Sequence, residues 1–246
     1  MAPLVAQTWN ELLQHVKKIR GELASPDRLW FRGQGNADYA LLPSLLRFGN
    51  GLDKEKFLFE KFRQFSLKVF PRRTDDWETL FDMQHYGIPT RLLDWTETLG
   101  IAVFFAATYN HRFYRGKDAA IFLLDPISLN AYSRIKKVPQ IPDDKDFNYR
   151  DIYWEKKPFA PSAPIAVEPI FLNDRILAQK GKFTIHGDDT NPIEVSCEKA
   201  AKRIVLTGTS IQEALEFLEI ANINEYSVFP DMSGIADYVR RSASLE

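Results

Sequence analysis

The longest stretch of the chain without a polar side chain is LGIAVFFAA, residues 99–107. It is far shorter than the roughly 20 residues that a helix needs to cross a bilayer, so we expect no membrane span here. The segment from Glu97 to Tyr109 has a helical pattern with apolar side chains on nearly every side. Such a helix must be covered by other elements, so the fold has to place it inside a layered structure.

Composition indicates one globular domain. The chain has 246 residues, of which 45% are hydrophobic and 13% aromatic. It can therefore bury a sizeable core, and we expect a single domain over residues 1–246. The formal net charge is -1, so the chain as a whole is not basic, as duplex-binding proteins are. Nucleic-acid binding would need a local basic patch. The N-terminus has no charged segment before an apolar run, which predicts a cytoplasmic protein without membrane contact.

Periodicity predicts helices and strands along the whole chain. We expect helices over residues 8–20, 55–70, 76–87, 97–109, 211–221 and after Asp231, and strands over 28–33, 88–95, 119–125, 164–171, 182–186 and 203–207. Helix caps are expected at Thr8, at Asp94 or Thr96, and at Ser210 with Glu213. Helices come early and strands mostly later, without regular alternation. This order predicts an α+β fold rather than a doubly wound sheet.

Residues 126–163 are rich in Pro, Asp, Lys and Asn. We expect a long irregular excursion over the surface, which could serve as a lid or as decoration. Its aromatic residues Tyr149, Tyr153 and Trp154 could stack on a ligand ring or pack the excursion onto the core.

Metal and thiol chemistry have weak support in the sequence. The single cysteine, Cys197, lies in the polar segment EVSCEKA and is expected near the surface as an ordinary small side chain. The four histidines, His15, His85, His111 and His186, have no metal-ligand spacing. We therefore expect no metal cofactor.

The first chemically suggestive motif is WFRGQ, residues 30–34. Arg32 at a strand end, followed by Gly33, could present its guanidinium into a cleft while the backbone approaches a ligand closely. Phosphate or carboxylate would be the natural counterpart, with Gln34 adding an amide. The structural alternative is an ion pair between Arg32 and a buried carboxylate such as Asp94.

The second motif is QHYGIPTRLLDWT, residues 84–96. It brings an imidazole, a phenol, a guanidinium, a carboxylate and a hydroxyl to the start of the apolar helix, whose free N–H groups can receive an anion. The candidate ligand-binding residues are His85, Tyr86, Arg91 and Asp94. The structural alternative is a helix cap with an Arg91 ion pair closing the core. We also expect Arg91 and Asp94 to contact the FRGQ strand end, with Asp94 paired to Arg32 or Arg91.

The third motif is NDRILAQKGKFTIH, residues 173–186. It predicts a turn at Lys180-Gly181 that places Gln179 at the rim of a sheet. The alternative is a hairpin with a polar tip.

Together these motifs resemble the FRG domain family, named for its Phe-Arg-Gly motif. The resemblance rests on FRGQ at 31–34, HYGIPTRLLDWT at 85–96, RILAQKGKFT at 175–184 and VFPDMSGIADYV at 228–239, in the family's order over about residues 28–240.

A more remote similarity to ADP-ribosyltransferases of the Arg-Ser-Glu type implies a mechanism. It implies a split β-sandwich of mostly antiparallel strands with N-terminal helices packed against it, and NAD as the substrate. Arg32, Thr96 and Gln179 match the catalytic Arg, Ser and Glu positions in order. Gln179 departs from that pattern because it carries no charge to stabilise an oxocarbenium-like transition state. Glu168, Asp174 or Asp94 could supply the missing carboxylate.

Two hypotheses from different classes follow. The first is an ADP-ribosyltransferase or NAD glycohydrolase acting as a toxin or phage-defence effector, with a protein or nucleic-acid acceptor. The second is a nucleotide- or nucleic-acid-binding module without turnover, in which basic stretches such as RFYRGK, residues 112–117, could take part. A protein-interaction domain whose motifs are purely structural remains a third reading.

Overall fold

The computed structural model describes residues 3–24, 26–69, 75–170 and 174–243. These residues form an eight-stranded sheet in the order β1-β8-β4-β2-β3-β7-β6-β5. The strands are β1 (Leu4–Ala6), β2 (Trp30–Gln34), β3 (Leu92–Thr96), β4 (Ala119–Leu124), β5 (Gln140–Ile141), β6 (Ile165–Pro169), β7 (Gly181–Ile185) and β8 (Ala201–Leu206). The β1–β8 and β5–β6 pairs are parallel, whereas the other neighbouring pairs are antiparallel. The expected α+β fold with mostly antiparallel strands is confirmed at this level.

The sheet is weakly joined at its centre. β2 pairs with β4 from Trp30 to Gln34, and β3 pairs with β7 along its whole length, but β2 and β3 share the single pair Phe31–Thr96. Beyond that pair the two strands carry no further ladder. The structure therefore has one open sheet in two halves, not two separate sheets packed face to face. We call the line between β2 and β3 the seam.

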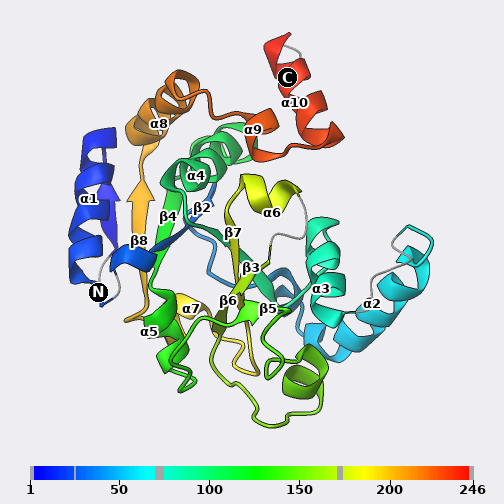
Figure 1. Cartoon of the computed structure of the whole chain (residues 1–246). Coiled ribbons are helices and arrows are strands. Elements are labelled where there is room, and N and C mark those ends of the chain that lie inside the picture. Colours follow the sequence, from blue (N-terminus) through cyan, green and yellow to red (C-terminus); the bar gives the residue numbers. More distant parts are fainter. Residues whose placement is uncertain (1–2, 25, 70–74, 171–173, 244–246) are drawn as a thin grey trace.

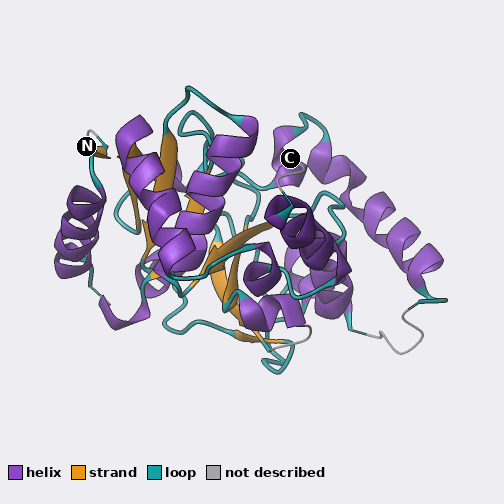
Figure 2. Cartoon of the chain, turned by 90° about the horizontal axis from the view of Figure 1, so that it is seen from above, coloured by secondary structure: helices purple, strands orange, loops and turns teal. Residues whose placement is uncertain are grey.

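Helices lie around the strands (Figure 2). The α-helices are α1 (Trp9–Glu22), α2 (Gly51–Ser66), α3 (Asp76–His85), α4 (Leu99–Phe113), α5 (Pro126–Ala131), α6 (Asp174–Ala178), α7 (Ile193–Ser196), α8 (Gly208–Ile220), α9 (Glu225–Val228) and α10 (Met232–Ser242). Short 3₁₀ turns, η1 (Pro26–Arg28) and η2 (Ser44–Arg47), flank β2 and α2. Figure 1 shows α1 and α8 at one end of the molecule and α2 and α3 at the other. Within the described ranges, no helix is both long and apolar enough to span a bilayer.

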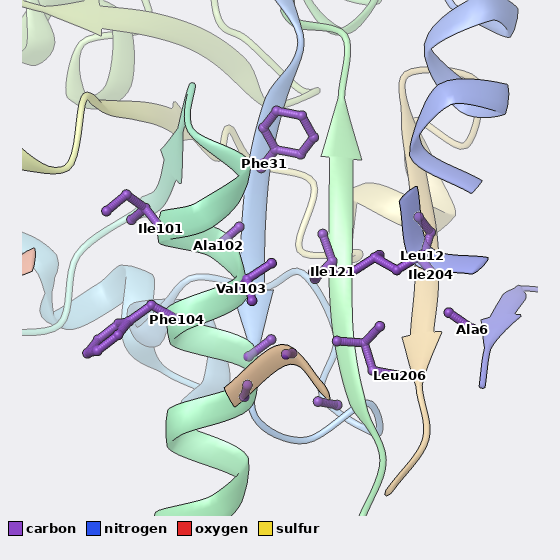
Figure 3. Packing of buried hydrophobic residues seen from close by; sticks show 14 of the residues in the cluster. Ala6, Leu12, Phe31, Ile101, Ala102, Val103, Phe104, Ile121, Ile204 and Leu206 are labelled. Carbon is purple, nitrogen blue, oxygen red and sulfur yellow. The ribbon is translucent and has the colours of Figure 1, made fainter. Parts of the chain in front are cut away.

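The apolar segment at residues 99–107 is the centre of the largest core cluster, as expected. It begins α4, whose residues Ala102, Val103 and Ala106 are fully buried. Figure 3 shows Ala102 and Val103 against β2, with Ile121 of β4 beside them. Residues of α1 and α8 belong to the same cluster. The buried side of α4 is thus held by packing, which sets its position relative to β2.

Two glycines of the FRGQG sequence allow α4 to lie directly on β2. A Cβ atom on Gly33 would lie 1.8 Å from the carbonyl oxygen of Ala102, and one on Gly35 would lie 2.7 Å from the backbone nitrogen of Asn110. The Asn110 side chain in turn donates to the Gly35 carbonyl at 2.7 Å. We expected these glycines to bring the backbone close to a ligand; in the structure they bring it close to a helix.

Residues 126–163 are more ordered than expected. They contain α5, β5 and a π-helical turn, η3 (Arg150–Trp154), instead of an irregular excursion. Tyr149 and Tyr153 are fully buried and pack with Trp77 of α3, so these aromatic residues hold the segment to the core. This is the second of the two roles considered for them.

Several local expectations need correction. Thr8 caps α1 as expected, and Asp231 caps α10. However, α4 begins after Thr98 rather than at Asp94 or Thr96, because both lie in β3. Ser210 and Glu213 form no capping box: Ser210 donates to the Ala6 carbonyl, and Glu213 accepts from the Trp9 backbone.

Two further expectations concern burial and strand length. Cys197 is buried in a core cluster and not near the surface. The strand expected over 164–171 is β6, and position 171 lies outside the described residues, as does residue 70 of the helix expected over 55–70.

Candidate functional site

A cleft of about 330 Å³ lies along the seam, where β2 and β3 separate. β2 supplies residues 31–34, β3 supplies residues 94–96, and α4 closes one wall. The lining residues are Phe31, Arg32, Gly33, Gln34, Gly35, Tyr39, Arg47, Asp94, Trp95, Thr96, Ile101, Phe105, Tyr109, Tyr114, Arg175 and Gln179. The volume falls within the range of small-molecule sites.

Arg32 bridges the seam. Its Nη1 donates to the backbone carbonyl of Asp94 at 2.7 Å, next to the point where the β2–β3 ladder stops. Its Nε is buried and has no hydrogen-bond partner among the residues that the structure describes. The side chain is 18% exposed, and burial lowers its pKa from the ordinary value, although an arginine stays charged. Arg32 therefore lines the cleft and has unused hydrogen-bonding capacity at its Nε.

Gln34 is a second buried group with a free atom. The residue belongs to the cleft lining and is only 7% exposed, and its Oε1 has no hydrogen-bond partner in the described part of the chain. An unpaired buried oxygen costs free energy unless a donor reaches it. A ligand with an N–H or O–H group at this position would satisfy it.

The cleft is cationic. Arg32, Arg47 and Arg175 line it, and among the described lining residues Asp94 is the single carboxylate. Arg47 lies near enough to Arg32 to lower its pKa further. Two unbalanced positive charges in a concave site attract an anion.

Asp94 is held at the cleft rim by polar contacts. Gln84 donates to its Oδ2 at 2.8 Å, and Thr90 donates to the Gln84 amide oxygen at 2.6 Å. The Asp94 carboxylate lies 3.8 Å from Nη1 of Arg32, and its side chain is 53% exposed. The expected contact with Arg32 is present, but the pair is open to solvent.

Because the Asp94 carboxylate is half exposed and 3.8 Å from Arg32, Asp94→Ala is expected to destabilise the protein by less than about 1 kcal/mol. Thermal unfolding of the variant, compared with wild type and with Asp38→Ala, whose carboxylate makes an exposed contact with Lys117, checks this. A loss of about 3 kcal/mol or more would show that the Arg32–Asp94 pair behaves as a buried one.

Arg32, Thr96 and Gln179 converge on the cleft from three different segments. The Thr96 hydroxyl donates to the Gln179 carbonyl at 2.6 Å and accepts from the backbone of Thr98 at 3.0 Å. The Gln179 amide donates to the Val228 carbonyl at 3.0 Å. Thr96 thus fixes the turn that carries Gln179 beside the cleft, and Gln179 joins that turn to α9.

His85 lies in a smaller extension of about 80 Å³, which shares Asp94, Arg175 and Gln179 with the main cleft. Burial lowers the His85 pKa, and nearby Arg175 lowers it further, with an opposing effect of Asp231. The imidazole is therefore neutral at neutral pH, where it can donate or accept a hydrogen bond.

The comparisons with known proteins identify the family of the segment that builds the cleft. The family model of the FRG domain matches residues 27–115. These residues form an FRG domain. The match contains β2, β3 and α4, which are three walls of the cleft. The segments with Gln179 and VFPDMSGIADYV lie outside the matched residues. No curated protein and no solved structure matches the chain.

Arg91 of the FRG domain lies away from the cleft. It is buried in an ion pair with Glu55 of α2, with Nε–Oε1 and Nη2–Oε2 distances of 2.6 and 2.8 Å. It also donates to the carbonyl of Gly187 at 3.1 Å. The expected contact of Arg91 with the FRGQ strand end is therefore wrong. This guanidinium closes the core, as in the structural alternative, although with a partner from a distant helix.

Tyr86 is also directed elsewhere. It is exposed and, with Ile88, lines an apolar groove of about 500 Å³ beside α2. The HYGIP segment of the FRG domain thus splits between two surfaces: His85 lies in the cleft extension and Tyr86 lies in the groove.

Sequence reasoning missed several cleft residues of the FRG domain and of the segments around it. Arg47 follows β2 in the turn η2, and Arg175 begins the RILAQKG motif, so both were near recognised motifs. Tyr39, Tyr109 and Tyr114 form an aromatic wall. A signal for Tyr109 was its position at the polar end of α4, one turn after Phe105.

Proposed function

We propose that the cleft binds a nucleotide of the NAD or ADP-ribose type through its phosphates. The single observation that carries this is the convergence of Arg32, Arg47 and Arg175 on a concave site with one carboxylate. Guanidinium groups match phosphate oxygens in charge and geometry. Arg32 lines the cleft, and its Nε–H has no partner among the described residues.

The rest of the lining fits the remainder of such a ligand. Tyr39, Tyr109 and Tyr114 offer ring faces to a base. The free Oε1 of Gln34 can accept from an amide or amino group of the ligand. The similarity to Arg-Ser-Glu type ADP-ribosyltransferases supports the same ligand, because Arg32, Thr96 and Gln179 share the cleft.

Turnover would need a carboxylate near the ribose. When the bond between ribose and nicotinamide breaks, positive charge develops on the sugar, and a negative group stabilises it. Asp94 is the carboxylate in the described lining, whereas Glu168 lies 3.8 Å from Lys182 outside it. We assign to Asp94 the role that Gln179 cannot fill, which is to stabilise the positive charge on the ribose. Water or an acceptor group would attack the ribosyl carbon, and nicotinamide would leave.

The test is titration calorimetry with NAD and with ADP-ribose, together with measurement of released nicotinamide. Arg32→Ala is expected to weaken binding by about 1.5–3 kcal/mol, or roughly ten- to a hundredfold, because it removes a charge-assisted hydrogen bond. Arg28→Ala on the exposed turn η1 is the control and should bind like wild type.

Arg175→Ala is a second test variant in case Arg32→Ala does not fold. Arg175 stacks on Phe229 and makes no contact with the seam backbone in the described hydrogen bonds. Wild-type protein that binds neither nucleotide would refute the proposal. So would nucleotide affinities that are unchanged in both folded arginine variants.

A second candidate function is binding without turnover. It is favoured by the contact of the Asp94 carboxylate with Gln84 and by the neutral amide at Gln179. Nucleotide binding with no nicotinamide release, and the same affinity in Asp94→Asn, would select this candidate.

A further inference from the structure

A chain of aromatic rings leads out of the cleft along the C-terminal half of α4. Phe105 contacts Tyr109 with ring centroids 5.6 Å apart, and Tyr109 contacts Phe113 at the same separation. Phe113 contacts Tyr114 at 6.4 Å, and Tyr114 contacts Tyr39 at 5.6 Å. We call these five residues the aromatic ladder. Four of them line the cleft, and Phe113 extends the ladder beyond it.

The ladder is more exposed than folding requires. Phe113 is 57% exposed, and Tyr39 and Tyr109 are also exposed. The spacing of Phe105, Tyr109 and Phe113 places them one turn apart on the same side of α4. A contiguous patch of exposed aromatic residues indicates a binding surface, whereas exposed apolar side chains scattered singly over a surface do not.

Arginines accompany the ladder outside the cleft. The guanidinium of Arg112 lies 5.3 Å from the centroid of the Phe113 ring. A groove of about 410 Å³ next to it is lined by Thr108, His111, Arg112, Arg115, Glu225, Asp237, Arg240 and Arg241. Four arginines face two carboxylates there, so this groove also carries excess positive charge.

Tyr109 connects the two cationic sites. It lines the cleft, and its ring contacts that of Phe113, over which Arg112 of the groove lies. The two sites are therefore linked through neighbouring rings of α4. Together they form a track of arginines and rings on a protein whose net charge is -1.

We propose that this track binds single-stranded nucleic acid, with bases on the aromatic ladder and phosphates on the arginines. Every base has a ring face that can stack on an aromatic side chain, and a single strand leaves those faces free. A duplex hides them inside its base stack. An acidic peptide would satisfy the arginines but would leave the exposed rings without a stacking partner.

The inference goes beyond the proposed function and rests on it at one point. The strand would enter the cleft that holds the nucleotide, which brings a nucleic-acid acceptor to the reactive ribose if turnover occurs. Phe113 and Arg112 lie outside the cleft lining, so they test strand binding separately.

The experiment is fluorescence anisotropy with labelled oligonucleotides of about 12 residues. The probes are single-stranded RNA, single-stranded DNA of the same sequence, the DNA duplex and a poly-glutamate peptide. Wild type is expected to prefer one or both single strands over the duplex and the peptide, with affinity falling as salt rises. The RNA and DNA arms show which sugar is accepted.

Variants locate the site. Phe113→Ala is expected to weaken single-strand binding about tenfold, since one stacking contact is lost. Phe65→Ala, a similarly exposed phenylalanine on α2 with 74% exposure, is the matched control and should have no effect. Arg112→Ala should reduce the slope of log affinity against log salt by about 1.

The inference is overturned if neither single strand binds, if the duplex or the peptide binds as tightly, or if Phe113→Ala binds like Phe65→Ala. ADP-ribose titration of wild type and of Phe113→Ala separates the two proposals. Wild type that binds ADP-ribose but no single strand removes this inference alone. Wild type that binds a single strand but no nucleotide removes the proposed function alone.

Discussion

Glu55→Ala is expected to lower the free energy of unfolding by about 3–5 kcal/mol, because it removes the carboxylate that pairs with Nε and Nη2 of the buried Arg91 guanidinium. The other carboxylate near Arg91, Asp188, is half exposed and 3.9 Å from Nη1. Both side chains of the Glu55–Arg91 pair are only 4% exposed. Tyr149 also donates to Glu55 Oε1 at 2.6 Å, and Trp154 donates to Oε2 at 3.1 Å. The carboxylate thus joins α2, the residue before β3 and the segment before β6, and its loss removes the acceptor of hydrogen bonds from three residues.

Urea unfolding of Glu55→Ala and Arg91→Ala measures this effect. The double variant should lose clearly less than the sum of the two single losses, since each single change already breaks the pair. Glu60→Ala, on the same helix with an exposed carboxylate near Arg150, is the control and should change stability by about 1 kcal/mol or less. A loss for Glu55→Ala as small as that for Glu60→Ala would contradict the assignment.

Gly33→Ala is expected to destabilise the protein by about 3 kcal/mol or to prevent folding, because β2 and α4 cannot both keep their positions. The added Cβ would meet the backbone of α4, including the Ala102 carbonyl oxygen at 1.8 Å, and a backbone atom cannot turn aside as a flexible side chain can. Gly49→Ala is the matched control, since nothing lies within 4 Å of its added Cβ. Thermal unfolding compares the two variants, and equal melting temperatures would show that α4 can shift away from β2.

Sequence patterns predicted the elements that local signals define. The apolar run of α4, the Thr8 cap of α1 and the helix that follows Asp231 depend on neighbouring residues, and the structure confirms them. The short edge strand β1 (Leu4–Ala6) was not predicted, since it forms by parallel pairing with β8 from the far end of the chain.

The face of α2 shows where local periodicity fails. The helical spacing of Leu58, Phe62, Phe65 and Val69 predicted a helix over 55–70, but it does not mark the buried side of that helix. Phe65 and Val69 are exposed, and the buried positions of the helix are Gly51, Glu55 and Phe59. A buried carboxylate decides the orientation of α2, and its partner Arg91 is too distant in sequence for a periodicity pattern to reveal it.

The residues of the cleft were predicted only in part, because contacts between segments that are distant in sequence leave no local pattern. Arg32, Asp94, Thr96 and Gln179 were chosen from motifs, and the structure brings them together. The motif that contains Arg91 did not reveal that Arg91 and Asp94 lie in different environments. They differ because the side chains of consecutive residues in and just before β3 point to opposite sides of the chain. Residues 126–163 were taken as irregular from composition, yet buried aromatic residues order them and none of these residues lines the cleft.

The most direct test of the account is a crystal structure of the protein with ADP-ribose. We expect the two phosphates to lie at the seam, within hydrogen-bonding distance of Arg32 and of Arg47 or Arg175, with the Oε1 of Gln34 accepting from the ligand. ADP-ribose bound elsewhere on the protein, or a seam that stays empty at saturating ligand in crystals with the cleft open to solvent, would contradict the central claim.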